Sequence, residues 1–377
     1  MKTLPLFILT IALFSTAMAQ NSKDKNFYLL VGTYTNEAKT NGIHVYTFNP
    51  ETGAYDEKSK VVDITNPSYL TISKDRKNVY SVSEGGEGKG LNAYSFDTAS
   101  GKLTLLNSGS AGGNGPCYVS VDDKKQTVFT GNYGGGSLSA TKLNKDGSLS
   151  TDIQKIQHEG TSVNKSRQDK PHVHAVVLSP DDRYLLVPDL GTDKVNVYRF
   201  EPGKEKVLSP ATPPSASVNP GGGPRHLTFH PNGKHAYLIL EMEGAVVGFD
   251  YKDGKLESKQ TITMLAPGFT GKVGAADIHI SPDGKFLYAS NRGEANDIVV
   301  YAIVKDGKLT YAGRTSEGIN TPRNFAIDPT GNFLLVANQN GNNIAIFKRD
   351  KSTGLLTATG KTIQVDKPVC LKFAAMD

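Results

Sequence analysis

The sequence predicts an all-β, seven-bladed β-propeller with four antiparallel strands in each blade, the last blade being closed by both chain ends. Three observations predict it: a motif that recurs roughly every 50 residues, Gly and Asn turns between short apolar runs, and partial copies of the motif at the two ends. The 39 Gly and 19 Pro are spread along the chain, as expected for a fold with many turns. We therefore expect 20–377 to form a single propeller domain.

Six complete copies of the motif follow one another along the chain. They begin at Pro67, Pro116, Val173, Pro224, Ala275 and Pro322. In each copy an alternating run leads to a tight turn, such as Ser-Pro-Asp-Gly at 281–284, and then to a run rich in Tyr, Leu and Val. A third run ends in an aromatic residue, and a Gly-Lys-Leu or Gly-Leu-Leu segment opens a fourth. Four antiparallel strands per unit is the composition of a propeller blade.

The two chain ends supply the seventh blade. The N-terminal "FYLLVGTYTNEAKTNGIHVYTFN" matches only the second and third runs, and the C-terminal "KPVCLKFAAMD" matches only a first run. Joining them closes the ring and removes the exposed strand edges of an open array. The absence of Trp disfavours the WD40 type of repeat.

The first nineteen residues form a secretory signal pattern. Lys2 precedes an apolar run over 4–14, and Ala-Met-Ala at 17–19 resembles a cleavage site. The run is too short to span a bilayer, and no Cys follows it, so we expect no membrane anchor. The sequence therefore predicts a signal peptide at 1–19 and a periplasmic or secreted mature protein beginning at Gln20.

Composition and motifs exclude several classes of function. The 42 basic and 37 acidic residues give a net charge of +5 with no basic block, which disfavours a nucleic-acid partner. No zinc-type motif is present, and arginines near the predicted channel mouth would repel calcium, so we predict no metal and no cofactor. Cys117 and Cys370 are predicted to be unpaired, half-buried thiols, although export would permit a disulfide. Nothing indicates an obligate interface, so a monomer is expected.

Charged residues interrupt the apolar runs at corresponding positions of the repeat. In a propeller the first strand of a blade lines the channel and the second returns beside it, so the start of one and the end of the other share one mouth. The first strands bring there Ser68, Tyr69, Cys117, Tyr118, His172, His174, Arg225, His226, Asp277, His279, Arg323 and Asn324. The second strands bring Tyr34, Glu84, Asn132, Tyr133, Asp189, Glu241, Asn291, Arg292, Asn338 and Gln339.

These positions predict a polar site. A charged side chain in a channel-lining strand costs desolvation free energy unless it is paired or used, so a functional role is predicted for His174, Arg225 and Glu241. His226 and His279 each lie one step from a channel-facing position, so they point either into the channel or between blades. The predicted substrate-binding residues are Asn132, Tyr133, His226, Asp277, His279, Arg292, Arg323 and Asn338.

Three segments resemble the lactonase family of seven-bladed propellers, which includes bacterial 6-phosphogluconolactonase and the fungal carboxy-cis,cis-muconate cyclase. They are "GGGPRHLTFHPNGKHAYLILE", "AADIHISPDGKFLYASNR" and "TPRNFAIDPTGNFLLVANQ", within a resemblance that extends from about Phe27 to Phe373. It implies a site at one end of the channel, in which the family's His, Arg and Glu correspond to His174, Arg225 and Glu241. Further family arginines match Arg292 and Arg323. The export signal departs from the family's cytoplasmic sugar-phosphate enzymes and disfavours phosphorylated gluconolactone as the physiological substrate.

The expected function is hydrolysis of a sugar-type or carboxylated lactone by an exported enzyme. Glu241 or His174 would activate water, and Arg225 would stabilise the oxyanion. Arg292 and Arg323 would bind a carboxylate or phosphate group, and Asn132, Tyr133 and Asn338 would bind hydroxyl groups. Two alternatives remain: an enzyme resembling the muconate cyclase that forms a lactone from a diacid, and a non-catalytic propeller that binds a carbohydrate or protein partner.

Overall fold

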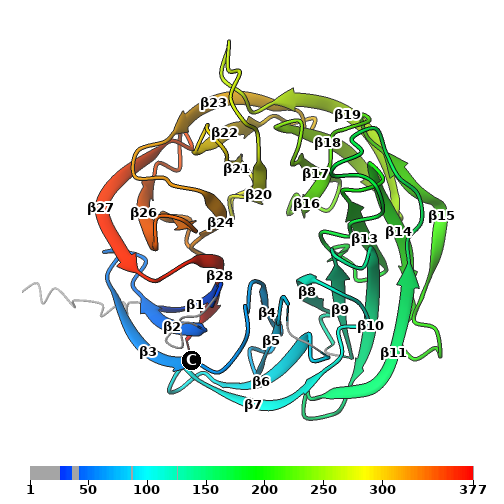
Figure 1. The fold of residues 1–377 in the computed structure, drawn as a ribbon. Coiled ribbons are helices and arrows are strands. Elements are labelled where there is room, and N and C mark those ends of the chain that lie inside the picture. The colour runs from blue at the N-terminus through cyan, green and yellow to red at the C-terminus, as the bar shows by residue number, and fades with distance from the viewer. Residues whose placement is uncertain (1–25, 36–41, 86–87, 125, 377) are drawn as a thin grey trace, which may run out of the picture.

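The computed structural model describes residues 26–35, 42–85, 88–124 and 126–376. They form seven four-stranded antiparallel sheets arranged as a ring around a central channel (Figure 1). The predicted all-β, seven-bladed propeller is therefore confirmed. The expected signal peptide, 1–19, lies outside the described residues. The described part of the chain contains no helix long and apolar enough to cross a membrane.

Blades are numbered here in chain order, and each runs from an inner to an outer strand. Blade 1 contains β4 (Leu70–Ile72), β5 (Asn78–Val82), β6 (Leu91–Asp97) and β7 (Lys102–Gly109). Blade 2 contains β8 (Pro116–Val121), β9 (Thr127–Asn132), β10 (Ser137–Leu143) and β11 (Leu149–Gln157). Blade 3 contains β12 (Val177–Leu178), β13 (Tyr184–Asp189), β14 (Lys194–Phe200) and β15 (Leu208–Ser217). Blade 4 contains β16 (Pro224–Phe229), β17 (His235–Leu240), β18 (Ala245–Lys252) and β19 (Lys255–Thr263). Blade 5 contains β20 (Ala275–Ile280), β21 (Phe286–Asn291), β22 (Asp297–Ile303) and β23 (Leu309–Thr315). Blade 6 contains β24 (Pro322–Ile327), β25 (Phe333–Asn338), β26 (Asn343–Arg349) and β27 (Leu356–Gln364). Blade 7 contains β28 (Pro368–Ala375), β1 (Phe27–Thr33), β2 (Ile43–Phe48) and β3 (Tyr55–Val61).

The seventh blade combines the two chain ends, as the sequence predicts. Its innermost strand is the C-terminal β28, which pairs antiparallel with β1 from Phe27 opposite Ala375 to Gly32 opposite Cys370. Figure 1 shows these first and last strands side by side. The pairing leaves neither chain end with an open strand edge inside the ring.

The hydrophobic core lies between neighbouring blades. Every residue of the second strands β13, β21 and β25 is buried, whereas the outer strand β3 has no buried residue. Second strands are apolar on both faces because each face packs against the adjacent sheet. Tyr288 and Ile298 of blade 5, for example, share one cluster with Leu334 and Val336 of blade 6.

Tyrosines on the second strands link successive blades. The hydroxyl groups of Tyr80, Tyr237 and Tyr288 donate to a glycine carbonyl in the outer turn of the following blade, at 3.0, 2.6 and 2.7 Å. Burying the ring while satisfying the hydroxyl makes tyrosine suited to this place. Because the blades are fixed to one another, side chains at the channel mouth have defined positions.

Candidate active site

The inner strands carry an extra residue near the channel mouth. In blade 4, Pro224 pairs with Leu240 and Leu227 with Leu238, so that two residues, Arg225 and His226, oppose one. The same two-against-one arrangement occurs in β20, and Arg323 is the extra residue of β24. Such a β-bulge redirects side chains that simple alternation would place on opposite faces. The side chains of consecutive polar residues can therefore all point toward the channel.

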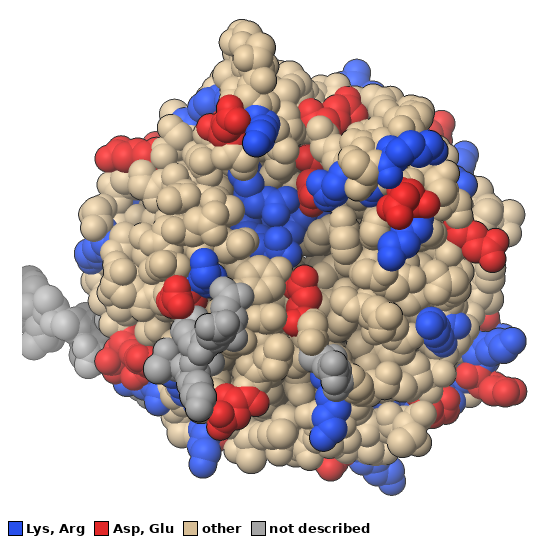
Figure 2. Space-filling view, viewed as in Figure 1, with Lys and Arg blue, Asp and Glu red and all other residues tan. Residues whose placement is uncertain are grey.

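The carboxylate of Glu241, directly after β17, is the centre of a charged cluster at this mouth. Its Oε1 lies 2.7 Å from Nη2 of Arg167. Its Oε2 lies 2.9 Å from Nε of Arg225 and 3.2 Å from Nη2 of Arg292. Nε2 of His174 is 3.8 Å from the same Oε2. The three predicted catalytic residues are thus brought together, and Figure 2 shows Lys and Arg side chains gathered at the centre of the ring.

The cluster sets the charge of its central groups. Burial would raise the pKa of Glu241, but the three arginines, Arg292 foremost, outweigh this effect and hold the pKa at about 2. Burial, assisted by Arg225, lowers the pKa of His174 well below its ordinary value. A carboxylate and a neutral imidazole therefore lie side by side at neutral pH, and either can accept a proton.

Arg225 is only 1% exposed, which is rare for arginine. Its Nη1 donates to the carbonyl of Ala276 at 2.5 Å, whereas the contact of Nε with Glu241 is a close charge contact without hydrogen-bond alignment. Its Nη2 donates no hydrogen bond to any residue that the structure describes. Arg292 is anchored similarly, with Nε donating to the carbonyl of Gly274 at 3.0 Å. An anchored arginine with a spare N–H is suited to bind a developing oxyanion.

Arg323 is the arginine of the mouth for which the described residues provide no polar partner. Its Cζ lies 5.2 Å from the ring centroid of Tyr34, whose hydroxyl donates to Oε2 of Glu84 at 2.9 Å. Ser68 donates to the same oxygen at 2.6 Å. Within the described ranges Arg323 makes no hydrogen bond and no ion pair. Its N–H donors are therefore available to a bound anion.

Arg167 is a member of the cluster that sequence reasoning missed. It lies on the segment 158–176 between β11 and β12 and donates to Glu241 at 2.7 Å and to the Tyr133 hydroxyl at 3.2 Å. The ring of Tyr133, a predicted site residue, packs edge-on against His174 with centroids 5.2 Å apart. The connecting segment has no counterpart in the repeat, so aligning the copies could not place Arg167. Its unusual length was the one available signal.

A second polar group lines the channel beside the cluster. Nδ1 of His226 is 2.7 Å from Oδ1 of Asp277, and Nε2 of His279 is 2.8 Å from Oδ2. Asn324 of blade 6 also donates to this carboxylate. The His226 ring contacts Tyr118 of blade 2, which is possible only across the channel. His226 therefore points into the channel, the first of the two orientations that the sequence left open. His279 shares the Asp277 carboxylate, and its ring packs edge-on against Phe325 of blade 6 with centroids 4.9 Å apart.

The two predicted asparagines lie elsewhere. Asn132 and Asn338 are fully buried, and their amides donate to the carbonyls of Ala111 and Gly318 at 3.1 and 2.8 Å. An amide at a strand end satisfies backbone groups that a turn leaves unpaired. Because both amides hold loops in place, we do not include these residues in the candidate site.

Both cysteines are free, as predicted, but they are buried rather than half-buried. Sγ of Cys117 lies 3.8 Å from Nδ1 of His174. Burial raises the pKa of Cys117 to about 12, so the thiol is protonated at neutral pH and is a poor nucleophile. Among the described residues, no group of three or more His, Cys, Asp or Glu could hold a metal ion.

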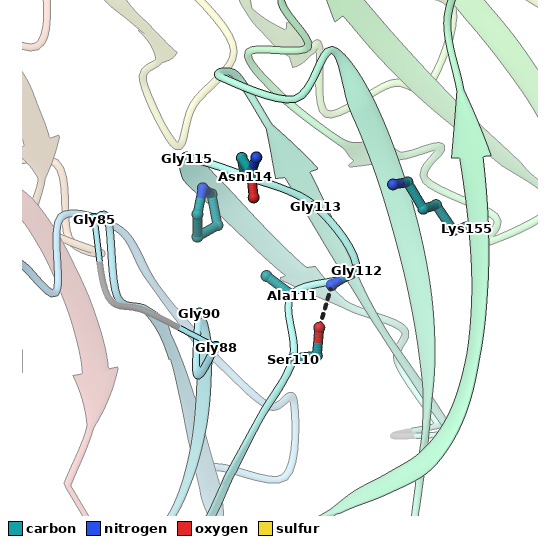
Figure 3. Close-up of a pocket in the computed structure, with 11 residues that line it drawn as sticks. Gly85, Gly88, Gly90, Ser110, Ala111, Gly112, Gly113, Asn114, Gly115 and Lys155 are labelled. Carbon is teal, nitrogen blue, oxygen red and sulfur yellow. Dashed lines mark hydrogen bonds between the residues drawn. The ribbon is translucent and has the colours of Figure 1, made fainter.

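A groove of about 620 Å³ lies between blades 1 and 2 (Figure 3). The residues lining it are Gly85, Gly88, Gly90, Ser110, Ala111, Gly112, Gly113, Asn114, Gly115, Pro116 and Lys155. None of the predicted site residues is among these described lining residues. This groove is therefore separate from the charged cluster.

Comparison with known proteins agrees with the fold. Residues 28–373 match the family model described as a seven-bladed β-propeller lactonase. This chain belongs to the lactonase family. The 6-phosphogluconolactonase of Bacillus subtilis (strain 168) is 36% identical over 345 residues, which cover 91% of this chain and 97% of the relative.

Solved structures of family members superpose closely. A Bacteroides fragilis protein is 43% identical with a TM-score of 0.88, covering 94% of this chain and 99% of its own. The periplasmic gluconolactonase of Pseudomonas aeruginosa is 38% identical with a TM-score of 0.88, covering 93% of this chain and 100% of its own. Membership of this lactonase family supports hydrolysis of a small-molecule lactone.

Proposed function

We propose that this protein is an exported hydrolase of a sugar-type or carboxylated lactone, acting at the channel mouth. The observation that carries the proposal is the convergence of Glu241, His174 and Arg225, from separate segments, beside Arg323, which has no polar partner in the described chain. Relatives named as 6-phosphogluconolactonase and as periplasmic gluconolactonase support a sugar lactone as substrate.

Binding uses the arginines that face the mouth. Arg323 and Arg292 hold the substrate's carboxylate or phosphate group, because a guanidinium fork matches two oxygens of such an anion. The Tyr133 hydroxyl, which already accepts a hydrogen bond from Arg167, binds a substrate hydroxyl. These contacts place the lactone carbonyl near Arg225 and Glu241.

Hydrolysis then requires a base, an oxyanion donor and a returned proton. Glu241 or His174 takes a proton from water as its oxygen bonds to the carbonyl carbon, and the free Nη2 of Arg225 donates to the resulting oxyanion. Collapse breaks the ring C–O bond, and the protonated base returns its proton to the leaving ring oxygen, which gives the hydroxy acid. A positioned base contributes about 10²- to 10⁴-fold, and an oxyanion donor about 10²- to 10³-fold.

A second candidate, a non-catalytic propeller that binds an anionic carbohydrate, also has an observation in its favour. Glu241 is already paired with arginines, which is the arrangement expected of a binding site without a free base. Such a protein would bind a sugar acid and would not accelerate lactone opening.

Acid release measured in a pH-stat tests the proposal and its rivals. The protein is supplied with gluconolactone and with 6-phosphogluconolactone, and the rate is compared with spontaneous opening. Acceleration that is lost in Glu241→Gln supports hydrolysis. Calorimetric binding of gluconate or 6-phosphogluconate without acceleration would favour the binding propeller, and loss of the ultraviolet absorbance of a muconate would favour the cyclase.

The proposed export of the protein needs a separate test. The leader pattern at 1–19 and the periplasmic relative support export. N-terminal sequencing of protein recovered after expression with its full leader should begin at Gln20. Retention of Met1 in a cytoplasmic product would contradict export without affecting the proposed reaction.

A further inference from the structure

The two carboxylate oxygens of Glu241 lie in different surroundings. Oε2 contacts Arg225 and Arg292 and lies near His174, all of which lie on the channel wall. Oε1 contacts Arg167 alone among the residues that the structure describes. The wall therefore holds one oxygen, and a side chain from outside the repeat covers the other.

Arg167 is more exposed to solvent than Arg225 and Arg292, the other two arginines that contact Glu241. Its side chain is 43% exposed, compared with 2% for Arg225 and 17% for Arg292. Moving either buried arginine would break contacts with backbone carbonyls of blade 5. Arg167, by contrast, can turn toward solvent at the cost of two side-chain hydrogen bonds.

The backbone that carries Arg167 is firmly attached. Gln168 is fully buried and donates to the carbonyl of Leu190 at 2.9 Å, and its own carbonyl accepts from the Ser162 N–H at 3.0 Å. Ser162 also donates from Oγ to Asp193 at 2.6 Å. Any displacement of Arg167 is therefore a rotation of its side chain, not a movement of the segment.

We propose that Arg167 is a displaceable counterion of Glu241, which covers Oε1 in the free protein and turns to bind the substrate's anionic group when the lactone enters. This inference rests on the proposed hydrolysis and names its base. Once uncovered, Oε1 takes the proton of the attacking water and later returns it to the leaving ring oxygen. No other reactant is needed.

The remaining charges around Glu241 explain why uncovering Oε1 matters. With all three arginines in place the carboxylate is a very weak base, and the best general base has a proton affinity matched to the working pH. The charged or titratable groups that face Glu241 are Arg167 on the segment before β12, His174 at its end, Arg225 on β16, Arg292 after β21, and Arg323 on β24. Of these, Arg167 is the most exposed ion-pair partner.

Kinetics of Arg167→Gln test the proposal. We expect KM for 6-phosphogluconolactone to rise about tenfold, KM for neutral gluconolactone to change little, and the acid limb of kcat/KM to move up by about one pH unit. Arg167→Lys should restore part of both effects. The control is Lys170→Gln, which removes a positive charge from the same segment, where Nζ contacts only the carbonyl of Gly134 among the described residues. Equal effects of Arg167→Gln and Lys170→Gln, or an unchanged acid limb of kcat/KM in Arg167→Gln, would overturn the proposal.

A measurement without turnover separates this inference from the proposed function. The Glu241 carboxyl is titrated by carbon-13 NMR in glutamate-labelled protein and assigned by its loss in Glu241→Gln. Its pKa should rise in Arg167→Gln and also in wild-type protein saturated with 6-phosphogluconate. An unchanged pKa in either case overturns the role of Arg167, whereas a shifted pKa in a protein without lactonase activity overturns only the proposed reaction.

Discussion

Arg225 and Glu241 face each other across the first two strands of blade 4, with Nε 2.9 Å from Oε2. The pair is almost completely buried, the two side chains being 2% and 10% exposed. The bulge in β16 makes the contact possible, because it lets Arg225 point along the mouth toward the end of β17. The bulge of one blade thus brings two members of the charged cluster into contact.

Neutralising Glu241 should destabilise the protein. Glu241→Gln leaves Arg225 and Arg292 buried without their counterion, and breaking such a pair costs about 3 to 5 kcal/mol. Urea unfolding measures this loss. Glu243→Gln, two residues further along the same turn, is the control, and we expect it to change stability by less than about 0.5 kcal/mol. Equal stability of the two variants would show that Glu241 does not compensate the buried arginines.

Replacing Arg323 should weaken substrate binding without lowering the stability of the protein. Arg323→Met keeps the packing on Tyr34 and removes a guanidinium that has no hydrogen bond in the described structure. KM for an anionic lactone should rise about tenfold or more, while the melting temperature stays unchanged or increases.

Arg349→Met is the matched contrast. Arg349 is buried and donates to Tyr288 at 2.7 Å and to Asp283 at 3.2 Å, so its replacement should lower stability without a selective change in KM. If Arg323→Met lowered stability as much as Arg349→Met did, Arg323 would be a structural residue.

Acid should destabilise the fold through the channel histidines. Burial, assisted by Arg225, lowers the pKa of His226 from its ordinary 6.5 to about 3. The unfolded chain then binds more protons than the folded one between these values, so stability is complete above pH 6.5 and decreases as the pH falls toward 3. Each such histidine contributes up to about 1.4 kcal/mol per pH unit. Glu241 acts in the same direction, from its ordinary 4.5 toward 2.

Melting temperatures recorded from pH 7.5 to pH 4 measure this dependence. His226→Gln should reduce the slope, and His230→Gln, in the turn between β16 and β17, is the control variant. A melting temperature that increased on acidification would contradict the neutral state assigned to His226.

Asp277 should prove essential to the channel lining. Its carboxylate binds His226, His279 and Asn324, and it is 1% exposed. Asp277→Asn removes a buried charge that satisfies several donors, which should cost about 3 kcal/mol or more. Asp306→Asn, in an exposed turn, serves as the control in the same unfolding assay. A stable Asp277→Asn protein would mean that the histidines find other partners.

The repeat made most of the fold predictable. Turn chemistry and strand periodicity are local, so six copies and two fragments suffice to predict the ring and its closure. The same alignment predicted which residues share the mouth, including the cluster of His174, Arg225 and Glu241. It could not predict β-bulges, which shift side-chain direction without a sequence signature, and so the orientation of His226 stayed open.

Other features depend on parts of the chain without a repeat counterpart. Arg167 enters the site from an irregular segment, where no periodic pattern links sequence to position. Asn132 and Asn338 occupy positions equivalent to site residues, but short amides there find backbone partners within reach. Position in the repeat therefore predicts proximity to the mouth, whereas side-chain length and local hydrogen bonding decide which residues reach it.

The most direct measurement is the initial rate of acid release from gluconolactone and 6-phosphogluconolactone at pH 7, with wild-type protein and with folded Glu241→Gln. The account predicts acceleration over spontaneous opening by the wild type for at least one of the two lactones, and a loss of about 100-fold or more in the variant. A wild-type rate equal to the spontaneous rate, or a variant as active as the wild type, would contradict it.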